Sequence, residues 1–376
     1  MMNQLTEPTL LLDKERCLRN IEQIVEKAAK NGLTLRPHFK THQSIEIGRW
    51  FRDLGVEKIT ASSLKMAEYF AMDDWRDITV AFPVNVREID RINSLAEKIT
   101  VNLLVVAPET IELLANGLRS AVNVFIEIDC GDHRTGLDPD DFGEIDQILA
   151  EIERSALITF KGFLTHAGHS YGIRSDQEAL AKLHQESLAL IAPLRARYSG
   201  TFPGLIISYG DTPTCSVMSD FPGVDEVRPG NLVFYDVVQS AIGSCHLDQI
   251  AVAMACPVVA KNPQRNEIVI YGGAVHLSKD LMILPDGSKT FGKIVNLTEN
   301  GWETSETGAY LKSLSQEHGV VHAPVEYLER IKLGDLVGVL PIHSCLTADL
   351  NSSYLTLDGE RINKFRFFDR TPLSPG

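Results

Sequence analysis

Short apolar segments alternate with amphipathic segments from about residue 18 to residue 240, and this alternation restricts the fold more than any other feature of the sequence. The strand-like segments are 33–36, 57–61, 77–82, 99–105, 121–128, 159–165, 204–208 and 225–228. The segments with helical spacing are 17–31, 63–72, 86–95, 108–118, 142–152 and 177–198. Strands that alternate with helices form parallel β-α-β units. The pattern therefore predicts a (β/α)8 barrel of the TIM type over residues 14–243.

A doubly wound open sheet is the competing architecture for this part of the chain. No Gly-x-Gly-x-x-Gly follows the first strand-like segment, which disfavours its dinucleotide-binding version.

The pattern changes after Gly243, where strand-like segments follow one another with few helical stretches between them. These segments are 249–260, 267–271, 334–340, 353–357 and 364–369. They predict a separate antiparallel β domain over residues 244–376, after the barrel. Residues 1–13 contain the strand-like run 9–12, which could join either domain.

Charge and hydropathy exclude several classes of partner. The net charge is −14 and no basic cluster occurs, which argues against binding to nucleic acid or to anionic membranes. No apolar stretch approaches the ~18 residues of a membrane-spanning helix, and the N-terminus lacks a signal-peptide pattern. The six cysteines are widely scattered, which is typical of a protein in a reducing cytoplasm.

Lys40 lies in the run Arg36-Pro37-His38-Phe39-Lys40-Thr41-His42, just after the first strand-like segment. Reactive groups of a barrel collect at the carboxyl ends of its strands. Cationic neighbours (Arg36, His38 and His42) are expected to lower the pKa of Lys40, and a neutral lysine can form a Schiff base. A single lysine at such a place is more often a solvated loop residue, so the prediction depends on the motifs after the other strands.

Polar, glycine-rich motifs follow four further strands. They are Asp129–Gly136 with Arg134, Thr165–Gly172 with His166, His169 and Tyr171, Ser208–Thr214 with Gly210, Asp211 and Thr212, and Arg228–Asn231 with Gly230 and Asn231. The last two resemble the phosphate-binding loops of a barrel. A reactive lysine and a phosphate cradle together suggest pyridoxal phosphate. Arg134 would suit a phenolate or a carboxylate, or else forms an ion pair within its own loop.

A second constellation, Pro341-Ile342-His343-Ser344-Cys345, follows the strand-like segment 334–340. Strand side chains alternate, so residues two apart are expected on one face. An imidazole and a thiolate suit Zn²⁺ or a related divalent ion. The pair alone is weak evidence, and a third ligand could be His318, water or a substrate oxygen.

The chain resembles the D-threonine aldolases and eukaryotic-type D-serine dehydratases, a family with the alanine racemase-like fold. The motifs that carry the resemblance are Thr9–Asp13, Arg36–His42, Asp129–Gly136, Gly210–Thr214, Arg228–Asn231, Gly272-Gly273 with Ser278 and Asp280, Glu317–Gly319, and Pro341–Cys345. Together they span nearly the whole chain.

The resemblance implies a homodimeric lyase of D-3-hydroxy amino acids that depends on pyridoxal phosphate and on a divalent metal (Zn, Mn or Co). It implies that Lys40 forms the Schiff base, and that His343 and Cys345 bind a metal that holds the β-hydroxyl of the substrate. Family aldolases tend to have aspartate at the position of Cys345, so the cysteine favours a dehydratase of the D-serine or D-threo-3-hydroxyaspartate type. Asp211 and Ser44 depart from the residues that relatives usually carry.

Alternative readings stay open at this point. The reaction could be a retro-aldol cleavage to glycine and an aldehyde, or a racemisation, and a non-catalytic carrier of pyridoxal phosphate is a further possibility. His166, His169 or Tyr171 could act as an acid–base group or as a ring-stacking wall, or could only make hydrogen bonds within the loop.

Overall fold

The computed structural model describes residues 4–305 and 307–365, which form two compact units. The first unit contains Leu18–Lys40 and Trp50–His246. The second contains the described residues of Met1–Cys17, Thr41–Arg49 and Leu247–Gly376. The domain boundary predicted from the sequence, between residues 243 and 244, stays a prediction.

The first unit is a barrel of parallel strands, as the alternation predicted. Its 8-stranded sheet has the order β2-β9-β8-β7-β6-β5-β4-β3. The strands are β2 (Thr34–Leu35), β3 (Lys58–Ala61), β4 (Asp77–Pro83), β5 (Thr100–Val105), β6 (Val122–Ile128), β7 (Ile158–Thr165), β8 (Ile206–Tyr209) and β9 (Glu226–Val227). A parallel bridge between His38 and Thr60 joins the two ends of this order, so the sheet closes.

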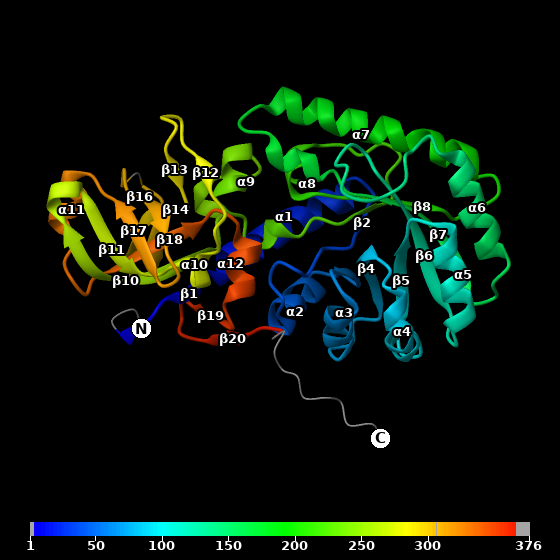
Figure 1. The fold of residues 1–376 in the computed structure, drawn as a ribbon, viewed down its shortest axis with the longest axis horizontal. Coiled ribbons are helices and arrows are strands. Elements are labelled where there is room, and N and C mark those ends of the chain that lie inside the picture. Colours follow the sequence, from blue (N-terminus) through cyan, green and yellow to red (C-terminus); the bar gives the residue numbers. More distant parts are fainter. Residues whose placement is uncertain (1–3, 306, 366–376) are drawn as a thin grey trace, which may run out of the picture. The chain divides into compact units, whose positions relative to one another are not determined.

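Helices cover the outer side of the barrel strands, and Figure 1 shows α3 to α6 on the outside of β3 to β7. The helices are α1 (Lys14–Lys30), α2 (Ile45–Asp53), α3 (Leu64–Ala71), α4 (Ile89–Ala96), α5 (Pro108–Gly117), α6 (Phe142–Glu153), α7 (Gln177–Tyr198), α8 (Thr212–Val217) and α9 (Val237–Ile242). The helices predicted at six places are confirmed. The six predicted segments do not include α2, nor α8 and α9, which are only six residues long.

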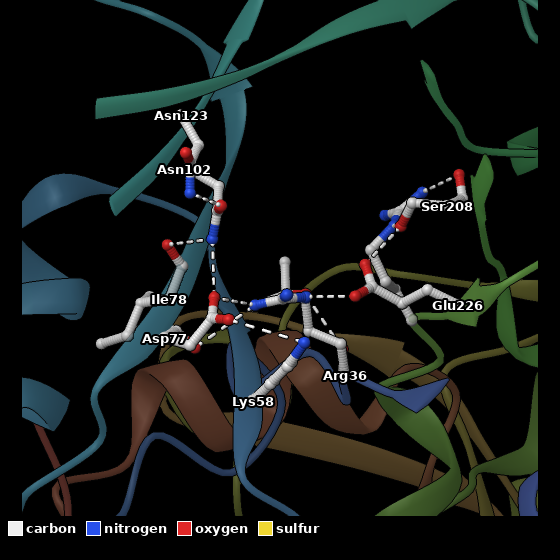
Figure 2. Close-up of polar contacts among 10 residues, drawn as sticks. Arg36, Lys58, Asp77, Ile78, Asn102, Asn123, Ser208 and Glu226 are labelled. Carbon is white, nitrogen blue, oxygen red and sulfur yellow. Dashed lines mark hydrogen bonds and ion pairs between the residues drawn. The ribbon is translucent and has the colours of Figure 1, made fainter. Parts of the chain in front are cut away.

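The interior of the barrel contains a polar network near the amino ends of β4 and β9 (Figure 2). Buried Arg36 contacts Asp77 on β4 at 2.6 Å and Glu226 on β9 at 2.7 Å. Because β4 and β9 are not neighbours in the sheet, the guanidinium must cross the inside of the barrel. The Asn102 amide extends the network by donating to Asp77. Removing either member of such a buried pair leaves an uncompensated charge, which is costly.

The barrel also has an apolar core cluster. It consists of Leu104, Phe125 and Leu164, and Ile206 packs against it. Burial of these side chains on successive parallel strands supplies the hydrophobic stabilisation of the closed sheet.

The second unit is built on a 10-stranded sheet that is mainly antiparallel, which confirms the predicted β domain. Its strands are β1 (Thr9–Leu12), β10 (Val252–Asn262), β11 (Glu267–Tyr271), β14 (Gly292–Thr298), β15 (Gly301–Glu303), β16 (Tyr310–Leu314), β17 (His318–His322), β18 (Leu336–Pro341), β19 (Ser353–Thr356) and β20 (Arg361–Asn363). The N-terminal strand β1 lies between β10 and β19. Of the strand-like segment 364–369, residues 366–369 lie outside the described residues.

A two-stranded hairpin, β12 (Met282–Ile283) and β13 (Lys289–Thr290), accompanies this sheet. Three short helices belong to the same unit: α10 (Ala274–Leu277), α11 (Val325–Arg330) and α12 (Ser344–Leu350). In the part of the chain that the structure describes, no helix combines the length and the apolar character needed to cross a bilayer.

Candidate active site

A cavity of about 440 Å³ opens at the carboxyl ends of the barrel strands. It is lined by His38, Lys40, Ser62, Ala81, Phe82, Pro83, Leu104, Glu127, Arg134, Thr135, Leu164, His166 and Arg228. The structure thus brings together three of the residues predicted from the sequence: Lys40, Arg134 and His166. This end of a barrel is where reactive groups are expected.

The cationic surroundings predicted for Lys40 come from other residues than the sequence suggested. Arg36 is taken up by the buried network with Asp77 and Glu226. Burial, joined by the charges of Lys40 and Arg228, holds the pKa of His38 well below its usual value, so His38 is neutral at pH 7. The expected cationic role of Arg36 and His38 is therefore wrong, because one is paired elsewhere and the other is uncharged.

His42, the third expected cation, belongs to the other unit and is fully buried. Burial lowers the pKa of His42 to about 3, so its ring is neutral at pH 7. The positive charges that line the cavity beside Lys40 are instead those of Arg134 and Arg228.

His166 follows β7 directly and is held by the loop after β8. Its Nδ1 lies 2.5 Å from the carbonyl oxygen of Gly210, so Nδ1–H donates to that oxygen. Burial, joined by the charges of Arg134 and Lys40, lowers the pKa of His166 to about 3. His166 is therefore a neutral imidazole at pH 7, with a fixed tautomer that leaves a lone pair on Nε2.

Glu127 and Arg228 also line the cavity. Sequence reasoning missed Glu127, and it named Arg228 only as the first residue of the motif Arg228–Asn231 without giving it a role. Burial raises the pKa of Glu127, whose Oε1 lies 4.0 Å from Arg134. Its Oε2 is buried without a hydrogen-bond partner among the described residues. Arg228 Nε donates to Ser208 Oγ at 2.7 Å. Glu127 lies on β6 two residues before the polar loop that starts at Asp129, and this spacing is the signal that could have indicated it.

The predicted phosphate cradle is a contiguous set of loops. The Thr212 backbone N–H donates to the Tyr171 hydroxyl at 3.2 Å, and the Asn231 N–H donates to Thr212 Oγ1 at 3.1 Å. Gly210 packs so closely that a Cβ would lie 2.9 Å from the backbone nitrogen of Arg228, so only glycine fits there. The structure therefore brings Tyr171, Gly210, Thr212 and Asn231 together, as the motif positions suggested.

Asp211 caps the first turn of α8. Its Oδ1 accepts from the Thr214 N–H at 2.7 Å and from Ser170 Oγ at 3.0 Å, and its Oδ2 accepts from Thr214 Oγ1 at 2.6 Å. This is the usual role of aspartate at a helix N-terminus. The carboxylate is thus engaged by its own helix and by Ser170.

Asp211 should make the free energy of unfolding depend on pH. Burial raises its pKa from 3.8 to about 6. As pH rises, the Asp211 carboxyl ionises in the unfolded chain before it ionises in the folded protein. Its contribution to the free energy of unfolding is therefore complete below pH 4 and is lost as pH rises towards 6. We expect Asp211→Asn to gain about 2 kcal/mol relative to the wild type between pH 4 and pH 7. Urea unfolding of both proteins measures this difference, and a difference that does not vary with pH would contradict it.

The short helix α8 is also held at its far end. Lys27 on α1 donates to the carbonyl oxygens of Cys215 and Met218, each at 3.1 Å, and to that of Ser216. A lysine at the carboxyl end of a helix satisfies carbonyls that have no partner within the helix. Asp211 and Lys27 together fix a segment whose own helix propensity is low.

In the second unit, His343 and Cys345 flank the start of α12. His343 is the N-cap in an extended conformation, and Cys345 lies in the first turn. The prediction that both lie on one face of a strand is wrong, because β18 ends at Pro341. The Cys345 thiol is buried 3.2 Å from Thr41 Oγ1, and His343 Nδ1 lies 3.3 Å from Asp280 Oδ2. An imidazole and a thiol held by neighbours form a donor set that fits Zn²⁺.

His318 does not complete this donor set. It lies on β17, in register with Tyr271 of β11. Among residues 4–305 and 307–365, no three His, Cys, Asp or Glu side chains are grouped so as to hold an ion.

Two family models match the chain in succession. Residues 12–237 match the alanine racemase N-terminal domain, and residues 251–357 match a putative serine dehydratase domain. The first match covers the barrel strands, and the second covers most of the β domain.

Relatives match over nearly the whole chain. D-serine dehydratase of Dictyostelium discoideum is 28% identical over 402 residues, with 97% of each chain covered. D-threo-3-hydroxyaspartate dehydratase of Delftia sp. (strain HT23) is 28% identical over 363 residues, with 94% of each chain covered. A solved structure of the metal-free form of a D-threo-3-hydroxyaspartate dehydratase, with one cysteine changed to alanine, has a TM-score of 0.89 at 27% identity. That alignment covers 97% of this chain and 99% of the other.

Proposed function

Because the chain belongs to the family of the alanine racemase N-terminal domain, we propose that it is a lyase of D-3-hydroxy amino acids that uses pyridoxal phosphate and a divalent metal. Within this class we propose a dehydratase that forms a 2-oxo acid and ammonia. The observation that carries the proposal is the placement of Lys40 on the wall of a cavity that also presents two guanidinium groups.

The cavity fits pyridoxal phosphate. It offers a primary amine, the cations Arg134 and Arg228, and a buried Glu127 oxygen without a partner among the described residues. When bound, this cofactor supplies an electron sink for negative charge at the substrate Cα. Lys40 would hold the cofactor covalently and, once released, would accept the Cα proton as a general base.

The other residues of the cavity have supporting roles in this proposal. Arg134, whose side chain is 55% exposed, would bind the substrate carboxylate or the cofactor phenolate. His166 would present a neutral ring, and its Nε2 can accept a proton or a hydrogen bond. The phosphate would lie at Gly210, Thr212, Gly230 and Asn231 with Tyr171 beside it, while Asp211 shapes the loop as the cap of α8.

We propose that His343 and Cys345 hold the metal, which as a Lewis acid would polarise the β-hydroxyl of the substrate. The donor chemistry of the pair supports this assignment. A further support is that a related dehydratase has been described in a metal-free form. The cysteine favours dehydration over aldol cleavage, because the aldolases that the chain resembles tend to have aspartate there.

A product screen on D-serine, D-threonine and D-threo-3-hydroxyaspartate tests the proposal. We expect pyruvate, 2-oxobutyrate or oxaloacetate, each with an equivalent of ammonia. Glycine with an aldehyde would instead identify an aldolase, and formation of the L-enantiomer a racemase. No turnover by protein that holds the cofactor would favour a carrier.

We further propose that the enzyme is a cytoplasmic homodimer with a barrel over residues 14–243 and a β domain over 244–376. All six cysteines are unbridged and buried, which suits a reducing compartment. Light scattering after size exclusion measures the oligomeric state.

A further inference from the structure

The side chain of Asp280 touches the proposed metal ligand His343 and is itself held by a strained serine. We infer that Asp280 is a positioning residue that fixes the His343 ring for metal binding, with Ser278 as its support. This inference rests on the proposed metal-dependent function. All three residues belong to the same compact unit, the β domain.

The contact between Asp280 and His343 determines which ring nitrogen faces the metal. Asp280 Oδ2 lies 3.3 Å from His343 Nδ1, within ion-pair distance, and the carboxylate charge favours a proton on that nitrogen. The tautomer that this contact favours has its lone pair on Nε2, and Nε2 is the nitrogen that we assign to the metal. A carboxylate behind a metal-binding histidine orients the ring and raises its basicity.

Ser278 holds Asp280 by two hydrogen bonds. Ser278 Oγ–H donates to Asp280 Oδ2 at 3.0 Å, and Ser278 Oγ accepts from the Asp280 backbone N–H at 3.2 Å. The serine has φ +67° and ψ −177°, a conformation that favours glycine. A side chain is kept at such a position only when its surroundings enforce it, which often marks a functional constraint.

The strained conformation of Ser278 is held by two neighbouring segments, which contain the motifs Gly272-Gly273 and Glu317–Gly319. The Gly272 N–H donates to the Glu317 carbonyl oxygen at 3.0 Å, and the Ala274 N–H donates to the Ser315 carbonyl oxygen at 2.8 Å. A Cβ on Gly273 would lie 2.2 Å from the carbonyl oxygen of Gln316, so no larger residue fits. The two segments therefore brace the turn that carries Ser278 and Asp280.

Helix α12, which carries Cys345, is tied to the same region. Thr347 Oγ1 donates to the Leu277 carbonyl oxygen at 3.1 Å, and Asn351 Nδ2 donates to the His276 carbonyl oxygen at 3.0 Å. The Asp280 turn and the start of α12 are thus fixed to each other through α10. This rigidity is what an orienting carboxylate needs, because a contact of 3.3 Å tolerates little relative movement.

The test measures metal affinity in the cofactor-loaded protein by competition between the protein and a chromogenic chelator for Zn²⁺. We expect Asp280→Ala to weaken Zn²⁺ binding by about 10- to 100-fold, the usual effect of removing such a partner, and Asp280→Asn to weaken it less. The matched control is Asp349→Asn, which removes the same charge from α12, where Asp349 bonds Gln43 instead. An affinity of Asp280→Ala equal to that of the wild type would overturn the inference.

Cobalt substitution separates an orienting role from direct ligation. The thiolate-to-cobalt band and the ligand-field bands of fully loaded Asp280→Ala should match those of the wild type. A change in the ligand-field bands that shows a lost ligand would mean that Asp280 binds the metal itself, and would contradict the inference.

Ser278→Gly separates positioning from stability. Glycine relieves the positive φ, so the variant should melt at or above the temperature of the wild type. It should still bind Zn²⁺ several-fold more weakly, since Asp280 loses both serine contacts. Unchanged affinity in this variant would count against the role of Ser278. If the wild type itself binds no stoichiometric metal, the proposal of a metal-dependent enzyme is wrong. That outcome is distinct from a wild type that binds metal and an Asp280→Ala variant that binds it equally well, which would contradict only the inference about Asp280.

Discussion

Lys40→Ala should lose lyase activity by at least about 10³-fold, within the range for removal of a catalytic acid or base. The visible absorbance of the bound cofactor should shift to that of non-covalently held pyridoxal phosphate. Both changes have one cause, because the Lys40 amine is proposed to hold the cofactor and to accept the Cα proton. Steady-state kinetics and an absorbance spectrum of the purified variant measure them.

Lys98→Ala is the matched control for this substitution, because Lys98 is an exposed lysine of the barrel unit that does not line the cavity. It should keep both the activity and the spectrum of the wild type. Lys40→Arg keeps the positive charge but not the nucleophilic amine, so it should be as inactive as Lys40→Ala. Activity in Lys40→Arg near that of the wild type would mean that only the charge matters.

Removal of the metal should lower dehydratase activity by at least about 10²-fold, because a Lewis acid stabilises the departing hydroxyl by several kcal/mol. Exhaustive chelation, His343→Ala and Cys345→Ala should all give this result. The cofactor absorbance should persist in each, since the residues that line the cavity with Lys40 belong to the barrel unit and His343 and Cys345 to the other. Added Zn²⁺ should restore the chelated wild type and not the two variants.

Cys256→Ala is the control for loss of a buried thiol. Cys256 lies on β10 of the same sheet, and burial raises the pKa of its thiol far above the usual range, so it is a packing residue. Its replacement should leave metal content unchanged. Full dehydratase activity after verified removal of divalent ions would rule out a metal-assisted reaction.

The barrel was predictable because each of its strands is a short apolar run between helical stretches, a signal that survives without tertiary information. The short helix α8 was not, since Thr-Pro-Thr-Cys-Ser-Val has little helix propensity and depends on Asp211 and Lys27 at its ends. Strands β12 to β17 escaped prediction for a similar reason. Most are short and contain polar residues, so they lack the continuous apolar run by which other strands were predicted, although β12 pairs with β13 and β16 with β17 close along the chain.

The candidate site was predictable where its residues lie in loops with unusual sequence. Lys40, Arg134 and His166 meet in one cavity, as their positions after strands suggested. Arg36 was misread because its sequence neighbours do not show that Asp77 and Glu226 reach it across the barrel interior. Glu127 looks like an ordinary strand residue in the sequence, and only closure of the barrel shows that it lines the cavity together with Arg228.

The most direct test of the account is to find where pyridoxal phosphate is attached. The protein is incubated with the cofactor, reduced with borohydride, digested and mapped by mass spectrometry. The account predicts one dominant pyridoxyl-phosphate adduct, on the peptide that contains Lys40. A label on another lysine, or none at saturating cofactor, would contradict it.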